Sequence, residues 1–126
     1  MPIDFKIDHS AKRVIARTHG TVTLADILSY FDAISVESAA TYPKLFDARE
    51  GTVELSDDDM MVLAARASIY AGFYPGPTAL VVDPTAASAV FARRYQNLAK
   101  TGREVEVFES RDRAEQWLWN AASGRD

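Results

Sequence analysis

The sequence contains no cysteine. This absence excludes thiol catalysis, zinc–thiolate sites and iron–sulfur chemistry. Long apolar runs are also missing: the longest strand-like one covers residues 78–82, whereas a membrane-spanning helix needs roughly 20 residues. The first residues alternate apolar and charged side chains instead of forming a basic and then apolar leader, and no Asn-x-Ser/Thr sequon occurs. We therefore expect a cytoplasmic protein without a membrane span.

Positive charge is not concentrated in any part of the sequence. The 14 basic and 18 acidic residues give a net charge of −4, and no local basic patch stands out. Because a nucleic-acid-binding protein needs such a patch, we expect no nucleic-acid partner. The 126 residues, 48% apolar and 25% charged, suffice for a globular core without disulfide or metal, so residues 1–126 are interpreted as one domain.

Hydrophobic spacing predicts strands and helices in alternation after an opening β-hairpin. Strands are expected near residues 3–7, 12–19, 44–47, 78–83 and 104–108. Helices are expected to begin at Thr23, Ser56, Pro84 and Ser110, the first with a capping box to Asp26 and the third with Asp83 as its cap. Gly20 and Gly51 are interpreted as the ends of strand segments.

The resulting order is β-β-α-β-α-β-α-β-α. Alternating strands and helices with short links favour right-handed crossovers and parallel strand pairs, and the hairpin adds one antiparallel strand. The sequence therefore predicts an α/β domain with a mixed, mostly parallel five-stranded sheet and four helices.

Core positions along the second half of the chain carry a family resemblance. With this element order, Leu80-Val81-Val82-Asp83, Val105-Glu106-Val107-Phe108 and then Ala114, Trp117 and Leu118 resemble the SpoIIAA-like family. Its members are small bacterial proteins with the STAS fold, which is also compared with CRAL-TRIO lipid-transfer domains. The resemblance implies a STAS-like fold and a regulatory or interaction module, and no cofactor.

The phosphorylation switch of STAS regulators is not carried over to this chain. Those regulators place a Ser or Thr in a loop after the third strand, where this sequence has Ala48 and Arg49. The nearest hydroxyl is Ser56, and three aspartates follow it directly. Their charge would repel a phosphate, so Ser56 is interpreted as a helix N-cap.

Neither the histidines nor the aspartate run predicts a metal site. His9 and His19 flank the second strand at opposite ends, about 25 Å apart if residues 12–18 are extended, so they cannot share one site. Asp57, Asp58 and Asp59 occupy consecutive helical positions that point about 100° apart. We interpret them as charges that favour the start of the helix, and no metal is predicted.

One candidate site lies at the carboxyl edge of the predicted sheet. Asp47 and Asp83 both end predicted parallel strands, and open α/β sheets bind their ligands at this edge. If these strands are neighbours, the two carboxylates lie near one crevice with Arg49 close by. A catalytic pair is one interpretation, and a cap before Pro84 is the other for Asp83.

The helix predicted over residues 56–71 is apolar on nearly all sides, which is typical of a helix covered twice. Its second covering could be the aromatic segment that follows it, another subunit or an apolar ligand. Trp119 lies off the inner stripe of the last helix, as contact-forming tryptophans often do. The interaction or ligand surface would consist of Met61, Val62, Ile69, Tyr70, Phe73, Tyr74 and Trp119.

These observations leave three functions open. The pattern favours a non-enzymatic STAS-like interaction module that contacts a protein partner or forms a homo-oligomer through this surface. The second is a carrier or sensor of an apolar, lipid-like molecule, bound between residues 56–71, the segment 70–74 and the sheet. The third is an enzyme using Asp47, Arg49 and Asp83, ranked last because the sequence shows no nucleophile–base pair.

Overall fold

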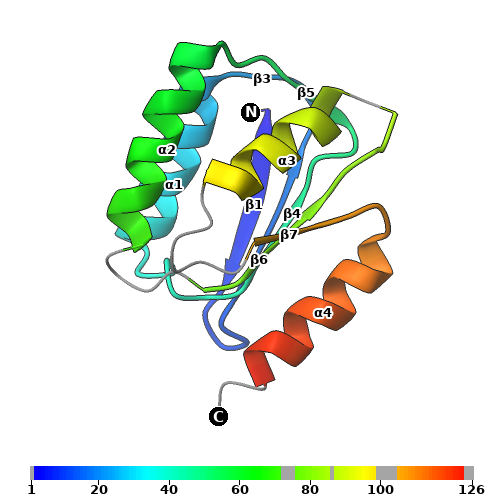
Figure 1. Ribbon diagram of the computed structural model, residues 1–126. Coiled ribbons are helices and arrows are strands. Elements are labelled where there is room, and N and C mark those ends of the chain that lie inside the picture. The colour runs from blue at the N-terminus through cyan, green and yellow to red at the C-terminus, as the bar shows by residue number, and fades with distance from the viewer. Residues whose placement is uncertain (1, 72–75, 86, 99–104, 124–126) are drawn as a thin grey trace.

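The structure is a computed structural model (Figure 1). It describes the backbone of residues 2–71, 76–85, 87–98 and 105–123, and the side chains there other than those of residues 64, 67–71, 87, 88, 98 and 121–123. The strands are β1 (Ile3–Asp8), β2 (Arg13–Thr18), β3 (Gly20–Val22), β4 (Lys44–Asp47), β5 (Gly51–Val53), β6 (Thr78–Val81) and β7 (Val105–Phe108). The helices are α1 (Leu24–Val36), α2 (Asp57–Ala71), α3 (Ala87–Leu98) and α4 (Arg111–Ser123).

The main sheet has five strands in the order β1-β2-β4-β6-β7. β1 and β2 form the antiparallel hairpin, and the pairs β2–β4, β4–β6 and β6–β7 are parallel. Over the described residues, the predicted α/β fold with a mixed five-stranded sheet and four helices is therefore confirmed. None of these helices is long and apolar enough to cross a membrane.

A short second sheet was not predicted. β3 and β5 pair in parallel, with Gly20 opposite Gly51. Gly20 has a φ of 64°, a left-handed conformation that glycine adopts at little cost, and it links β2 to β3. A Cβ at Gly51 would collide with the side chain of Thr18. Both glycines were interpreted as breaks, but they allow the chain to bend and the two short strands to approach.

The sheet has unequal layers on its two faces. Figure 1 shows α4 alone on one face, and α1, α2 and α3 together on the other. Successive residues of the central strands belong alternately to the cores on the two faces. Leu45 of β4 and Ala79 of β6 lie in the core under α4, whereas Phe46 and Leu80 lie in the larger core. Successive strand side chains point to opposite faces, so a run such as residues 78–82 fills both cores.

Local signals fix two helix starts as predicted. Thr23 and Asp26 form the capping box of α1. Ser56 caps α2, with its Oγ accepting from the Asp59 backbone N–H and its own N–H donating to the Asp59 carboxylate. These bonds satisfy amide groups that have no partner within a helix.

The predicted start of α3 is wrong. The helix begins at Ala87 and not at Pro84, and Asp83 does not cap its first turn. Its carboxylate instead accepts the backbone N–H of Thr85 at 3.0 Å and the Thr85 hydroxyl at 2.8 Å. An Asp side chain can form such a local turn as readily as a helix cap, and Asp83 forms the turn. The predicted stop at Gly102 lies outside the described residues.

Candidate functional site

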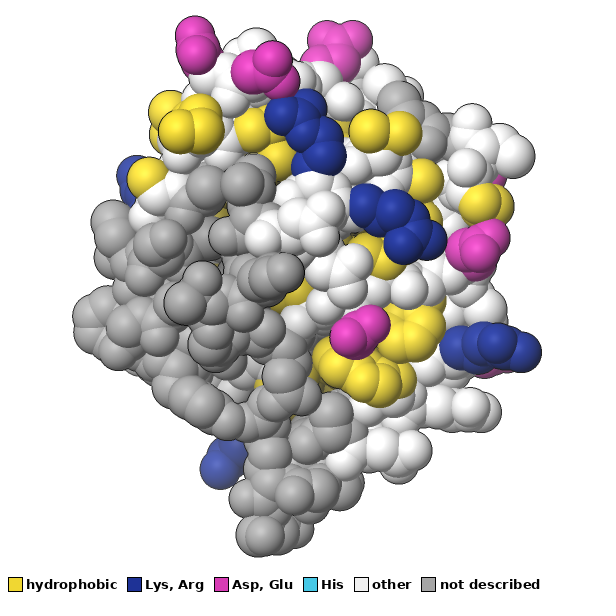
Figure 2. Space-filling model, viewed as in Figure 1, with side chains coloured by type: hydrophobic (Ala, Val, Ile, Leu, Met, Phe, Trp, Pro, Cys, Tyr) yellow, Lys and Arg dark blue, Asp and Glu magenta, His cyan; other side chains and the backbone are white. Residues whose placement is uncertain are grey.

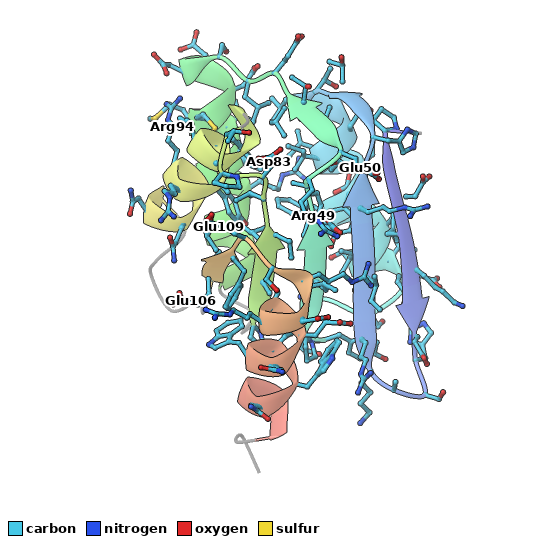
Figure 3. All side chains as sticks on the ribbon, turned by 90° about the vertical axis from the view of Figure 1, so that its right-hand side faces the viewer. Arg49, Glu50, Asp83, Arg94, Glu106 and Glu109 are labelled. Carbon is cyan, nitrogen blue, oxygen red and sulfur yellow. The ribbon has the colours of Figure 1, made fainter. Side chains whose placement is uncertain are left out.

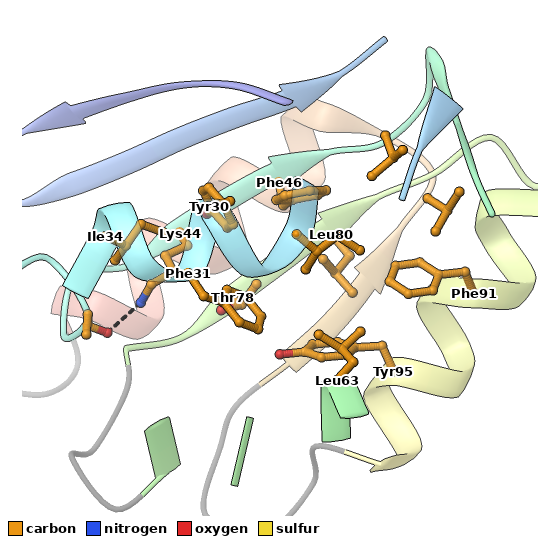
Figure 4. Close-up of a pocket in the computed structure, with 14 residues that line it drawn as sticks. Tyr30, Phe31, Ile34, Lys44, Phe46, Leu63, Thr78, Leu80, Phe91 and Tyr95 are labelled. Carbon is orange, nitrogen blue, oxygen red and sulfur yellow. Dashed lines mark hydrogen bonds between the residues drawn. The ribbon is translucent and has the colours of Figure 1, made fainter. Parts of the chain in front are cut away.

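A cavity of about 60 Å³ lies between the sheet and the three helices of the larger layer (Figure 4). Its lining is almost entirely apolar, and Lys44 and Ile34 lie at one end while Phe91 and Tyr95 lie at the other. The lining residues are Val22, Ile27, Tyr30, Phe31, Ile34, Ala40, Lys44, Phe46, Val53, Leu63, Thr78, Leu80, Phe91 and Tyr95.

Helical and strand periodicities bring these residues to one place. α1 supplies side chains spaced three and four apart, from Ile27 through Tyr30 to Ile34, which share one helix face. β4 and β6 supply alternate residues, such as Phe46 and Leu80. The cavity is thus formed by the regular inner faces of the elements and not by an irregular loop.

Aromatic rings make up much of the cavity wall. Tyr30 meets Phe46 edge to face, with ring centroids 5.4 Å apart, and meets Phe5 of β1 in the same way at 5.4 Å. On α3, Phe91 and Tyr95 stack at 6.2 Å with an interplanar angle of 23°. Such pairs add attraction beyond the area they bury, so they hold the wall in a defined shape.

Few polar atoms accompany this lining. The Tyr30 hydroxyl is buried, and no hydrogen-bond partner for it is found among the described residues. Burial, with a smaller contribution from nearby Tyr95, raises the pKa of Tyr30, so the phenol stays protonated. At the end of the cavity, Lys44 Nζ donates to the carbonyl oxygens of Ala40 at 2.6 Å and Tyr42 at 2.8 Å.

At the carboxyl edge, the structure brings Asp47 and Arg49 together. Arg49 Nε and Nη2 donate to the two Asp47 carboxylate oxygens at 2.9 and 2.7 Å, and Arg111 Nη1 lies 4.0 Å from Asp47 Oδ2. Burial alone would raise the pKa of Asp47, but the hydrogen bonds from Arg49 and the charges of both arginines outweigh it and lower that pKa. The carboxylate is therefore held as a bound anion, which makes it a poor proton acceptor.

Asp83 lies two residues beyond the end of β6. β6 pairs with β4, so the condition set for bringing Asp83 and Asp47 to one edge of the sheet is met. In Figure 3, Arg49 and Asp83 project at the same end of the sheet. The hydrogen bonds from Thr85 lower the pKa of Asp83. Asp47 and Asp83 each have their own partner, and neither has the raised pKa that a general acid or base needs near neutral pH.

The predicted interaction surface is described only in part. Met61 and Val62 of α2 are 68% and 47% exposed, so they do form an apolar surface. Trp119 is half-buried against the core under α4, and the Arg13 guanidinium covers its ring 4.0 Å from the centroid. The side chains of Ile69 and Tyr70, and residues Phe73 and Tyr74, lie outside the described residues.

The histidines lie apart, as the sequence predicted. His9 Nδ1 is 2.8 Å from the Tyr42 hydroxyl, while His19 Nε2 is 2.9 Å from Asp4 Oδ2 at the other end of β2. Both side chains are exposed.

The aspartates that open α2 have separate roles. Asp57 pairs with Arg94 of α3 at 2.9 Å, and Asp59 bonds to the backbone of Ser56. Within the described part of the chain, no three His, Asp or Glu side chains converge as metal ligands.

Comparison with solved structures identifies the fold. The chain aligns with an uncharacterised protein of the DUF3478 family from Shewanella loihica PV-4, described as having a SpoIIAA-like fold. The TM-score is 0.59 and the identity 21%, over 92% of this chain and 93% of the other. The chain has a SpoIIAA-like fold. No protein-family model and no curated protein matches the sequence.

The SpoIIAA-like fold was expected from the core positions quoted above, but the cavity within it was not. The hydrophobic spacing of the first helix predicts one apolar stripe that does not include Tyr30 and consists of Leu24, Ile27, Leu28, Phe31 and Ile34. The spacing of Tyr30 from Ile27 and Ile34, three and four residues, is the signal that could have placed it on the inner face.

Proposed function

We propose that this SpoIIAA-like domain is a non-enzymatic module that binds a small apolar molecule in the cavity between its sheet and α1, α2 and α3. The observation that carries the proposal is the cavity itself, open space within a wall of aliphatic and aromatic side chains. Ligand pockets of proteins are mostly apolar with few polar groups, and they lie between elements of the scaffold. This location overlaps the one expected for an apolar ligand, because Leu63 of α2 and the sheet both contribute.

The size of the cavity limits the ligand. Its volume of about 60 Å³ is below the roughly 150 Å³ of an engineered apolar cavity that holds benzene. A slender alkyl group therefore fits better than a ring or a two-chain lipid. Each buried methylene contributes about 0.8 kcal/mol, so a chain of four or five methylenes gives a dissociation constant on the order of millimolar.

The test is ligand-observed NMR with pentane as the probe. We expect saturation transfer to pentane in the wild type, and its loss in Ala40→Leu, a variant that fills the cavity from its lining. A matched change outside the cavity, Val90→Leu on the exposed side of α3, should leave binding intact. The proposal fails if the wild type gives no transfer, or if both variants retain it equally.

A second candidate is the interaction module, favoured by the exposed Met61 and Val62. Figure 2 shows hydrophobic side chains in separate groups among charged and polar ones over the described part of the face turned toward the viewer. Interfaces normally have larger continuous apolar patches, so the cavity is the stronger basis for a function. Light scattering during size exclusion tests the candidate: a dimer converted to monomer by Met61→Asp supports it, and a monomeric wild type opposes self-association.

A further inference from the structure

The strand β1 forms one edge of the main sheet. It pairs with β2 on one side, and in Figure 3 no described helix or strand lies beyond it on the other. β1 has six residues, whereas β7 at the opposite edge has four. An unpaired edge of this length presents a row of backbone groups to which another strand can bind.

The register of the hairpin shows which backbone groups are unpaired. The N–H of His19 donates to the carbonyl oxygen of Pro2 at 2.9 Å, in the same register that sets Asp4 opposite Arg17. Hydrogen-bonded and non-hydrogen-bonded pairs alternate along an antiparallel ladder, so the backbone groups of the even-numbered residues of β1 point toward β2. The odd-numbered residues, whose backbone groups point away from the sheet, are Ile3, Phe5 and Ile7.

The side chains of β1 alternate with the same period. The even-numbered ones are exposed charges of alternating sign, from Asp4 through Lys6 to Asp8. The odd-numbered ones are apolar and lie on the α1 side, where Phe5 contacts Tyr30 and is still 39% exposed. The free edge therefore combines unpaired backbone groups with an exposed aromatic ring.

We infer that β1 pairs with β1 of a second copy of this chain, antiparallel and centred on Phe5, so that two main sheets join into one. In this register Phe5 lies opposite Phe5 of the second copy, Ile3 opposite Ile7, and Asp4 opposite Lys6. The apolar pairs fall at the residues whose backbone groups point outward, so the ladder of hydrogen bonds forms there. The two Asp4–Lys6 pairs fall at the intervening positions, where opposing side chains lie closest.

The order of the charges selects this register. A shift of the second copy by two residues in either direction keeps the backbone hydrogen bonds in phase, but it sets Asp4 opposite Asp4 or Lys6 opposite Lys6. Like charges directly opposite one another destabilise a strand pair. Asp4 Oδ2 also lies 2.9 Å from His19 Nε2, which leaves its other oxygen for Lys6 of the second copy. No residue of β1 lines the cavity, so this inference does not depend on the proposed ligand function.

The test is analytical ultracentrifugation of the wild type and charge-reversal variants. The wild type should change from monomer to dimer as its concentration rises, because two paired strands bury little area and form a weak complex. Asp4→Lys leaves lysine at both positions and Lys6→Asp leaves aspartate at both, so each variant alone should dimerise about tenfold more weakly or worse. Glu106→Lys is the matched control, because it changes the net charge as much as Asp4→Lys but at an exposed position of β7. It should dimerise like the wild type, and so should Met61→Asp, which alters the surface of α2.

An equimolar mixture of Asp4→Lys and Lys6→Asp gives the decisive result. The lysines of one protein then lie opposite the aspartates of the other, so a heterodimer should form at least as well as the wild-type dimer. Misfolded variants would not recover in this way. A wild type that stays monomeric up to about 1 mM, a range that detects weak dimers, overturns the inference. A mixture that stays monomeric, or single variants that dimerise like the wild type, also overturns it.

Single cysteines test the register, since the chain has none of its own. Phe5→Cys should form an intermolecular disulfide on oxidation, because Cα atoms of a hydrogen-bonded antiparallel pair lie about 5.5 Å apart, within the range that a disulfide spans. Ile7→Cys should stay reduced, because position 7 lies opposite position 3 of the second copy. A disulfide from Ile7→Cys and none from Phe5→Cys would contradict pairing centred on Phe5.

Discussion

The two faces of the central sheet are built differently. Under α4, the core residues Leu45, Ala79, Val81, Ala114 and Leu118 are all fully buried. On the other face, three helices and the β3–β5 sheet cover a larger core that contains the cavity. A single helix can pack closely on a sheet because it has no other layer to contact. Three helices and a second sheet must also pack against one another, which makes complete filling of the core harder.

The two faces also differ in the side chains at their centres. The α4 face has short side chains at its centre, such as Ala79 and Ala114, which bring helix and sheet close together. The other face uses Tyr30, Phe46 and Phe91, whose large rings hold the elements apart. The cavity lies beside these rings.

The largest expected effect comes from shortening a leucine in each core. Leu118→Ala should lower the free energy of unfolding by about 3–5 kcal/mol, because it opens a new cavity in the filled α4 face. Leu63→Ala should cost less, about 2–3 kcal/mol, because Leu63 already borders open space and loses fewer contacts. Urea denaturation measures both. Equal losses would contradict the difference between the faces.

Low pH should destabilise the protein through Asp47, which lies near Arg111 of α4. Its pKa is lowered in the folded protein, so its stabilising contribution is present above the ordinary pKa of about 4 and is lost as the pH falls through the lower folded value. Asp47→Asn should lower stability at pH 7 by about 1.5–3 kcal/mol, the value of hydrogen bonds to a charged group. Stability of the variant should also depend less on pH below about 4, the ordinary pKa of an aspartate.

Asp83→Asn is the control for this pH profile. Asp83 also has a lowered pKa, but it is half-buried and the hydrogen bonds described for its carboxylate both come from Thr85. Denaturation at a series of pH values should show a smaller change in slope than for Asp47→Asn. A larger change for Asp83→Asn than for Asp47→Asn would show that Asp47 is not the main source of the acid sensitivity.

Replacing an alanine by leucine should change the stability of the protein in opposite directions on the two faces. Ala79→Leu adds volume to a filled core and should destabilise the protein by about 1–3 kcal/mol. Ala40→Leu adds the same atoms beside the cavity and should stabilise the ligand-free protein by about 0.5–1 kcal/mol. Thermal unfolding compares the two, and destabilisation by both would mean that the cavity cannot accept a side chain from Ala40.

The smallest effect is expected at the buried hydroxyl of Thr18. Thr18→Val keeps the shape and removes an oxygen without a described partner, so stability should stay within about 1 kcal/mol of wild type or rise. Thr18→Ser removes a fully buried methyl instead and should be less stable than both. If Thr18→Val proves less stable than Thr18→Ser, the hydroxyl has a partner that matters for folding.

Much of the fold could be predicted because its signals are local. Alternation in residues 3–7, the Thr23–Asp26 capping box and the apolar run ending at Asp83 each set one element, and the order of elements restricts the sheet. β3 and β5 escaped prediction because three residues carry too little periodicity. Their pairing depends on two glycines 31 positions apart, and only the folded chain brings these together.

The candidate site was less predictable because a cavity is a property of distances between elements. Phe46, Leu80 and Phe91 have the pattern of ordinary core residues, and nothing in that pattern shows that space remains between them. The sequence did predict Asp47 and Asp83 as candidate site residues, because charged residues at the ends of predicted strands can be identified without a structure. In the structure, Asp47 is hydrogen-bonded to Arg49 and Asp83 to Thr85, and these bonds lower the pKa of each carboxyl group.

The ends of the main sheet have a consequence for association between copies. Unpaired edge strands attract other strands and can start aggregation. The first strand, β1, carries exposed charges at Asp4, Lys6 and Asp8, which oppose the approach of another strand in any register that sets like charges opposite one another. The last strand, β7, is only four residues long, and the Gln96 side chain occupies the carbonyl oxygen of its Val105 at 2.8 Å. Charge at one edge, and short length with a side-chain contact at the other, disfavour extension of the sheet into fibres.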